Sequence, residues 1–217
     1  MSSTQGSSPQ PAAPDGVAHG ANRSYWLVPV LRAVPAIVVG LGITFTEDHS
    51  PRIGLIAFGA FALVTGVIIL VGSRRLPQDR VVRGVFVAQG AIAVASGVAA
   101  VMLWASGIGV LLLIVTVYAA LTGVLELYAG LRLRGAAAAR DWLTIGACTA
   151  VAAIVFVLTP PDSILVVGLV GAYGIILGVF LLIAGLSLKW AGEKPDESEP
   201  PQEDPPSSDP AEREASA

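Results

Sequence analysis

The sequence has little charge, a single cysteine and only two histidines. Just 13% of its 217 residues are Asp, Glu, Lys or Arg, whereas ordinary soluble domains carry about 25%. Cys148 cannot form an intramolecular disulfide, and packing is the simplest role for it. The shortage of charge excludes an ordinary soluble domain, and the shortage of Cys and His argues against a metal site.

Motifs of common enzyme classes are also missing. The sequence contains no glycine-rich phosphate loop, no H-E-x-x-H pair and no G-x-S-x-G motif. We therefore expect a protein that is not an enzyme, without catalytic residues, cofactor or metal. Its arginines are explained by membrane topology and anionic lipid headgroups, so we expect no nucleic-acid partner.

Apolar sequence, by contrast, is abundant, with 54% hydrophobic residues. A helix needs about 20 mainly apolar residues to cross a bilayer, and an open sheet cannot satisfy its edge hydrogen bonds in lipid. Residues 25–190 are therefore predicted to form an all-α domain in the lipid bilayer. Its six transmembrane helices are expected at 25–45, 53–72, 84–105, 107–131, 142–159 and 164–188.

Both ends of the chain differ from this middle part. Residues 1–24 are rich in Ser, Pro, Gly and Ala, and the Pro-rich residues 191–217 hold nine Asp or Glu against Lys194 and Arg213. Neither segment can bury enough apolar surface to offset the entropy of ordering it. We expect two disordered tails, the acidic one serving either as a docking segment for a cytoplasmic partner or only as a solvated end.

Basic residues distinguish the two sides of the membrane. On one side, the connections between the expected helices contain a single basic residue, Arg52. The positive-inside rule places the other side, and with it both termini, in the cytoplasm. That side is expected to carry Arg23, Arg74, Arg75, Arg80, Arg83, Arg132, Arg134, Arg140 and Lys189.

A pattern of an aromatic residue, four further residues and a glycine occurs in three of the expected helices. It ends at Gly66, Gly123 and Gly178, with spacings of 57 and 55 residues. The pattern predicts three two-helix hairpins that enter the membrane from the same face. Repeats of this kind are related by an axis along the membrane normal, here a pseudo-threefold axis. The hairpins are expected at 25–72, 84–131 and 142–188.

Small residues follow each other at heptad spacing in several of these helices. A strip of glycines lets helix backbones approach closely, which stabilises helix pairs in lipid. We expect these glycines to pack helices within one chain, with the contact surface of a homo-oligomer as the alternative. The glycines concerned are Gly40, Gly66, Gly90, Gly97, Gly123, Gly130, Gly146, Gly174, Gly178 and Gly185.

Arg32 and Glu126 are the charged residues that lie well inside the expected helices. Both are expected roughly 10 Å deep in the same leaflet, given a rise of about 1.5 Å per residue. An isolated charge there costs at least about 2.5 to 3.5 kcal/mol, so pairing or a wet cavity is expected. Aligning the hairpins puts Gln89 in the place of Arg32, and we predict that Arg32, Gln89 and Glu126 form one polar cluster. The cluster either fixes the helix register or marks a proton or solute path; a third interpretation is that Arg32 only reaches back to the surface.

A second candidate site is the loop that contains Glu47, Asp48 and His49. These three residues would gain positive charge as the external pH falls. They form either an acid-sensing group or an ordinary solvated loop.

Several of these motifs together resemble a known family. Y-A-A-L-T-G-V-L-E-L-Y-A-G-L-R-L-R (118–134), W-L-T-I-G (142–146) and G-A-Y-G-I-I-L-G (171–178) look like the HdeD family of bacterial six-span inner-membrane proteins. The resemblance covers residues 26–188 and neither tail. It implies a membrane protein associated with acid resistance or stress in the bacterial inner membrane, in a structural or interaction role. The alternative is a small transporter or channel whose path passes Arg32, Gln89 and Glu126.

Overall fold

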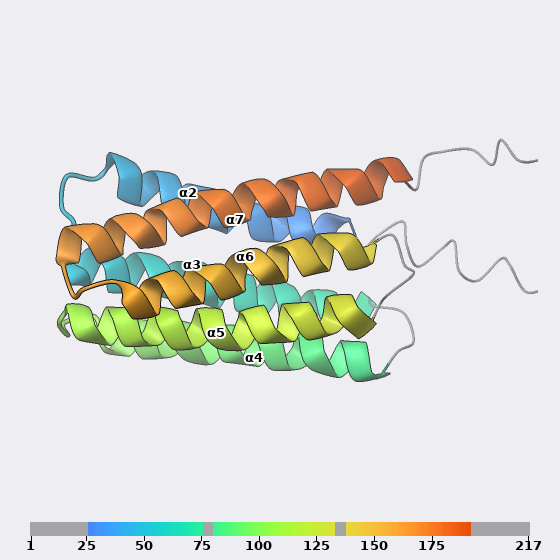
Figure 1. The fold of residues 1–217 in the computed structure, drawn as a ribbon, viewed down its shortest axis with the longest axis horizontal. Coiled ribbons are helices and arrows are strands. Elements are labelled where there is room, and N and C mark those ends of the chain that lie inside the picture. Colours follow the sequence, from blue (N-terminus) through green and yellow to red (C-terminus); the bar gives the residue numbers. More distant parts are fainter. Residues whose placement is uncertain (1–25, 76–79, 133–137, 192–217) are drawn as a thin grey trace, which may run out of the picture.

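The computed structural model describes residues 26–75, 80–132 and 138–191. Within these ranges it contains helices and no strands, and six helices are long and apolar enough to cross a membrane (Figure 1). These helices confirm the prediction of an all-α membrane protein with six helices that are long and apolar enough to cross the bilayer. The helices are α2 (Leu27–Phe45), α3 (Pro51–Gly72), α4 (Arg80–Met102), α5 (Ile108–Arg132), α6 (Ala138–Leu158) and α7 (Ser163–Ala191), with a short 3-10 turn, η1 (Ser73–Arg75), after α3.

Some helix ends differ from the predicted ones. Helices α4 and α6 each begin four residues earlier than expected, because hydropathy detects only the part that suits lipid while helical hydrogen bonds continue into the polar flank. Helix α4 also ends at Met102 rather than at 105, since the backbone turns there and Ser106 N donates to Leu103 O at 2.9 Å. Except for Ala191, the last residue of α7, both predicted tails lie outside the described residues.

The six helices lie side by side along the long axis of the molecule (Figure 1). The most extensive contacts join α2 with α7, α3 with α4, and α5 with α6. Helices α3, α5 and α7 also contact one another, so they form the centre, and α2, α4 and α6 each pack mainly against one of them. Each predicted hairpin therefore makes its widest contact with the next one, and α7 closes the ring by packing against α2.

Glycines allow these pairs to approach closely. A Cβ atom added to Gly66 would lie 2.8 Å from Val94 N and 2.9 Å from Gly90 O, and one added to Gly123 would lie 2.9 Å from Ala150 N. Such distances leave no room for a side chain larger than hydrogen. Each glycine predicted to pack helices meets an atom of a neighbouring helix in this way, within 3.0 Å: Gly40, Gly66, Gly90, Gly97, Gly123, Gly130, Gly146, Gly174, Gly178 and Gly185. Four further glycines that were not predicted meet a neighbouring helix in the same way: Gly54, Gly59, Gly72 and Gly171.

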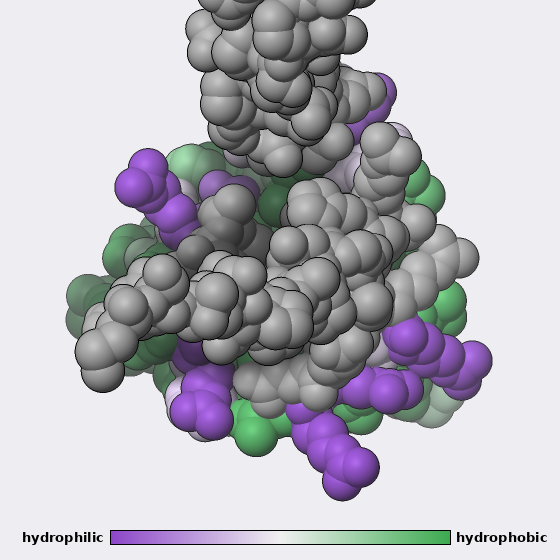
Figure 2. All heavy atoms as spheres, turned by 90° about the vertical axis from the view of Figure 1, so that its right-hand side faces the viewer, coloured by the Kyte–Doolittle hydropathy of each residue, from purple (hydrophilic) through white to green (hydrophobic). Residues whose placement is uncertain are grey.

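The two ends of the helix bundle differ in charge. At one end, which we call the basic end, six of the described basic side chains are exposed, and Figure 2 shows hydrophilic side chains projecting around its rim. The opposite end, the loop end, consists of the connections at 46–50, 103–107 and 159–162. Between the ends, large apolar side chains such as Val38, Leu113 and Ile183 are exposed, as expected for helices that contact lipid. The six basic residues are Arg74, Arg80, Arg83, Arg132, Arg140 and Lys189.

Candidate functional site: a buried polar cluster around Glu126

Glu126 of α5 lies in the core of the bundle, with only 2% of its surface exposed. Its Oε1 atom is 3.0 Å from Nη2 of Arg32 in α2, and it accepts a hydrogen bond of 2.6 Å from Nε2 of Gln89 in α4. Arg32 and Gln89 are as buried as the carboxylate. The structure thus brings together the three polar residues that the sequence singles out, from three different helices.

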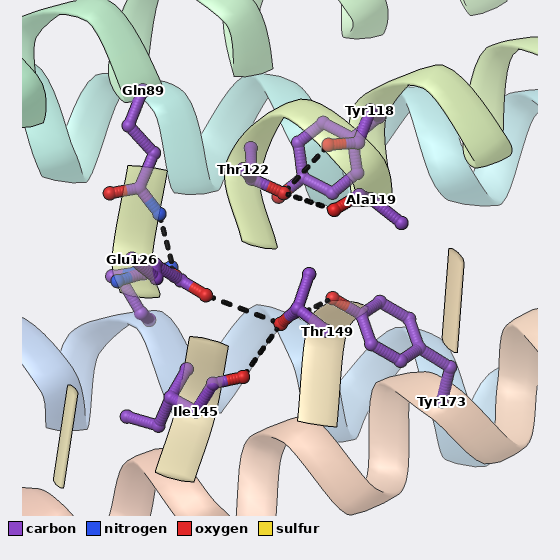
Figure 3. A network of polar contacts seen from close by, with 9 residues as sticks. Gln89, Tyr118, Ala119, Thr122, Glu126, Ile145, Thr149 and Tyr173 are labelled. Atoms are coloured by element: carbon purple, nitrogen blue, oxygen red, sulfur yellow. Dashed lines mark hydrogen bonds and ion pairs between the residues drawn. The ribbon is translucent and has the colours of Figure 1, made fainter. Parts of the chain in front are cut away.

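Two further residues extend the cluster on the other side of the carboxylate. Thr149 of α6 has its hydroxyl 3.2 Å from Glu126 Oε2, and Tyr173 of α7 donates to that hydroxyl at 3.3 Å. Figure 3 shows Thr149 between Glu126 and Tyr173, with Gln89 on the opposite side of Glu126. The Thr149 hydroxyl also lies 3.0 Å from the Ile145 carbonyl, and its single proton serves one of these two acceptors at a time. Five helices therefore contribute a side chain to one hydrogen-bonded group.

Sequence reasoning missed Thr149 and Tyr173. Threonines inside helices commonly bond the carbonyl four residues back, and the tyrosine fitted the aromatic repeat. A signal did exist, because Thr149 is one helical turn from Ile145, the position that aligns with Arg32 and Gln89. Polar residues one turn apart on that face point to the same place in the bundle.

The two sides of the ion pair are not equally satisfied. Glu126 has hydrogen-bond partners at both carboxylate oxygens. Arg32, in contrast, uses only Nη2, and its Nε and Nη1 atoms have no hydrogen-bond partner among the described residues. The Oε1 atom of Gln89 is unpartnered in the same sense. A buried pair depends on additional hydrogen bonds to offset its desolvation, and here the carboxylate has them while the guanidinium does not.

Buried apolar side chains lie on both sides of the cluster along the bundle. On the side of the basic end, Phe86 and Trp142 meet edge to face at 4.6 Å between ring centroids and pack with Val28, Ile69 and Val82. Towards the loop end, the Tyr118 ring contacts Phe58 and Phe61. All of these side chains are buried. The carboxylate and the guanidinium are therefore held in a medium of low dielectric, where pairing matters most.

Comparisons with known proteins add nothing to this geometry. No family model, no curated protein and no solved structure matches this chain. What the chain does must therefore be argued from its membrane-spanning helices and from the chemistry of the cluster itself.

The second candidate site lies at the loop end. Asp48 Oδ1 accepts a hydrogen bond of 2.9 Å from Ser50 N, and His49 Nδ1 lies 3.2 Å from the Glu47 carbonyl. Glu47 and Asp48 are exposed, and His49 is partly exposed. These contacts are those of a local turn that leads into α3. The loop supplies no contact to the buried cluster, which lies nearer the basic end.

Neither a metal nor a thiol site accompanies these residues in the part of the chain that the structure describes. Within it, no three His, Cys, Asp or Glu side chains are placed so that they could hold a metal ion. Cys148 is a free, partly buried thiol next to Thr149. The groups that the cluster presents are a carboxylate, a guanidinium, an amide and two hydroxyls.

Proposed function

We propose that this protein is a non-enzymatic integral membrane protein in which the buried cluster fixes the arrangement of the helices. The observation that carries the proposal is that Glu126 is enclosed and is paired with Arg32 at 3.0 Å. Sliding α5 by one turn would move the carboxylate by about 5.4 Å, away from its partners. Removing one partner of a buried pair costs about 3 to 5 kcal/mol, so the pair selects one register.

The three-hairpin interpretation is part of this proposal. It is supported by the contacts of α3 with α4, α5 with α6, and α7 with α2, which follow one pattern around the ring. Gly66, Gly123 and Gly178, which align in the sequence, each lie at one of these contacts. In this interpretation Glu126 is the feature that is not repeated, since Ile69 and Leu181 occupy its place in α3 and α7.

Reversing the charges tests the structural role. We expect Arg32→Glu and Glu126→Arg each to reduce the yield of folded protein, because each places two like charges together in the core. The double variant restores opposite charges and should recover much of the yield. A double variant that folds no better than either single one would refute the pairing role.

At the cellular level, the resemblance to the HdeD family suggests a structural or interaction protein of the bacterial inner membrane, associated with stress or acid resistance. The basic end would then face the cytoplasm, together with both termini, and the acidic tail would be available to a cytoplasmic partner. Reporter fusions to the C-terminus test the orientation. Survival of a deletion strain in acid tests the stress role, and an unchanged response with His49→Ala would dismiss Glu47, Asp48 and His49 as an acid-sensing loop.

A small transporter or channel is the second candidate. The unpartnered Arg32 and Gln89 atoms and the chain from Tyr173 through Thr149 to Glu126 favour it. Purified protein in liposomes distinguishes the candidates, because a structural protein should give no proton or solute flux. A substrate-dependent flux that Glu126→Ala abolishes would favour the transporter.

A further inference from the structure

Part of the buried cluster is left without hydrogen-bond partners. A guanidinium group has five N–H donors in a rigid plane, and Arg32 directs only one nitrogen, Nη2, at an acceptor. Its Nε and Nη1, and Oε1 of Gln89, are buried polar atoms with no partner among the described residues. Leaving a buried donor or acceptor unmatched costs about 1 to 3 kcal/mol, and more for a charged group.

The unsatisfied atoms belong to two side chains that share one acceptor. Both side chains donate to the same oxygen, Glu126 Oε1, at 3.0 and 2.6 Å. Their remaining polar atoms are two donors, Arg32 Nε and Nη1, and one acceptor, Gln89 Oε1. The arrangement requires a molecule that accepts hydrogen bonds from Arg32 and donates one to Gln89.

Charge decides which molecule fits. Arg32 and Glu126 together are neutral, so an anion would add an uncompensated charge to a buried site, which is costly. An anion would also leave the Gln89 acceptor unmatched. Water both donates and accepts, and buried waters typically make about three hydrogen bonds to polar groups of this kind. A lipid headgroup does not suit the site, because Arg32, Gln89 and Glu126 are each at most 2% exposed.

We propose that Arg32 and Gln89 hold ordered water inside the bundle, with water accepting hydrogen bonds from Arg32 Nε and Nη1 and donating to Gln89 Oε1. This hydration site goes beyond the register-fixing role of the ion pair. The pair can fix the helices with or without water, so the charge-reversal experiment and the one below can fail separately.

Infrared spectroscopy of the full-length protein in lipid films tests the proposal. After bulk water is removed, films prepared with D2O should retain O–D stretching bands of internal water that shift when ¹⁸O-labelled water is used. Gln89→Met keeps the length of the side chain but removes the acceptor, and it should abolish or displace these bands. Arg32→Lys, which keeps the charge but removes the planar donors, should do the same.

Thr149→Val is the matched control. It removes a buried hydroxyl from the same carboxylate, but at Oε2 rather than Oε1, and should leave the bands in place. Wild-type films without isotope-sensitive bands would overturn the proposal, even if the variants failed to fold. Bands that Gln89→Met leaves unchanged would also overturn it.

Discussion

The half of the bundle nearer the basic end and the half nearer the loop end are held together differently. Around Glu126, five helices contribute polar side chains whose contacts have fixed donors and acceptors. Towards the loop end, the buried side chains that the structure describes are apolar, and Phe58, Leu111 and Val115 are fully buried. In a membrane, an apolar side chain gains little free energy by moving from lipid into the protein core, because both are apolar. The loop half therefore depends on close van der Waals packing, whereas an ion pair and hydrogen bonds specify the half that contains Glu126.

The largest effect is expected where a charge loses its partner. Glu126→Leu leaves Arg32 buried and unpaired and should destabilise the protein by about 3 to 5 kcal/mol. Reversible unfolding by SDS in mixed micelles measures this change. The double variant Arg32→Met with Glu126→Leu removes both charges and should be clearly more stable than Glu126→Leu alone. Equal stability of the two variants would contradict the pairing.

A smaller effect is expected from a cavity in the loop half. Leu111→Ala should cost about 2 kcal/mol, the low end of the range for buried leucines, because the unfolded side chain stays in an apolar medium. The same unfolding measurement applies. Val124→Ala is the control, since Val124 is 63% exposed on the outer side of the same helix, and it should change little. A cost at Val124 as large as that at Leu111 would argue against a tightly packed loop half.

The close approach of the helices can be tested through the glycines. Gly66→Ala places a methyl group 2.8 Å from Val94 N, and overpacking of this kind costs about 1 to 3 kcal/mol. Gly168→Ala in α7 is the matched control, because nothing lies within 4 Å of the added atom. Gly66→Ala should therefore lower the resistance of the protein to SDS, and Gly168→Ala should not. Similar values for both would mean that the α3–α4 contact is looser than described.

The smallest effect is expected at the edge of the polar cluster. Tyr173→Phe removes the hydrogen bond to Thr149 and should cost about 0.6 kcal/mol, the average for such bonds between membrane helices. Tyr128→Phe, at a residue that is 48% exposed, should have no measurable effect. If Tyr173→Phe lowered the stability nearly as much as Glu126→Leu does, the hydroxyl would support the ion pair directly.

Individual residues show how much of the site and the fold could be predicted from the sequence. Arg32 and Glu126 could be singled out because a charge in an apolar helix is costly, and their depth followed from helix geometry. Thr149 was missed, because a threonine that bonds its own helix looks the same in sequence as one that bonds a carboxylate, and its place one turn from Ile145 was the one signal. The helix ends at Arg80 and Ala138 were also missed, since hydropathy does not detect a helix that continues beyond the lipid.

By itself, the sequence determined that six apolar helices form and that positive charge gathers at one end, because apolar length and charge are properties of each segment. Only the tertiary structure decided that α7 packs against α2, and that Arg32 meets a carboxylate 94 positions further along the chain. It also decided which atoms of the cluster are satisfied and which are not. These outcomes depend on how helices from distant parts of the chain fit together, and on short-range hydrogen bonds whose partners no single segment contains.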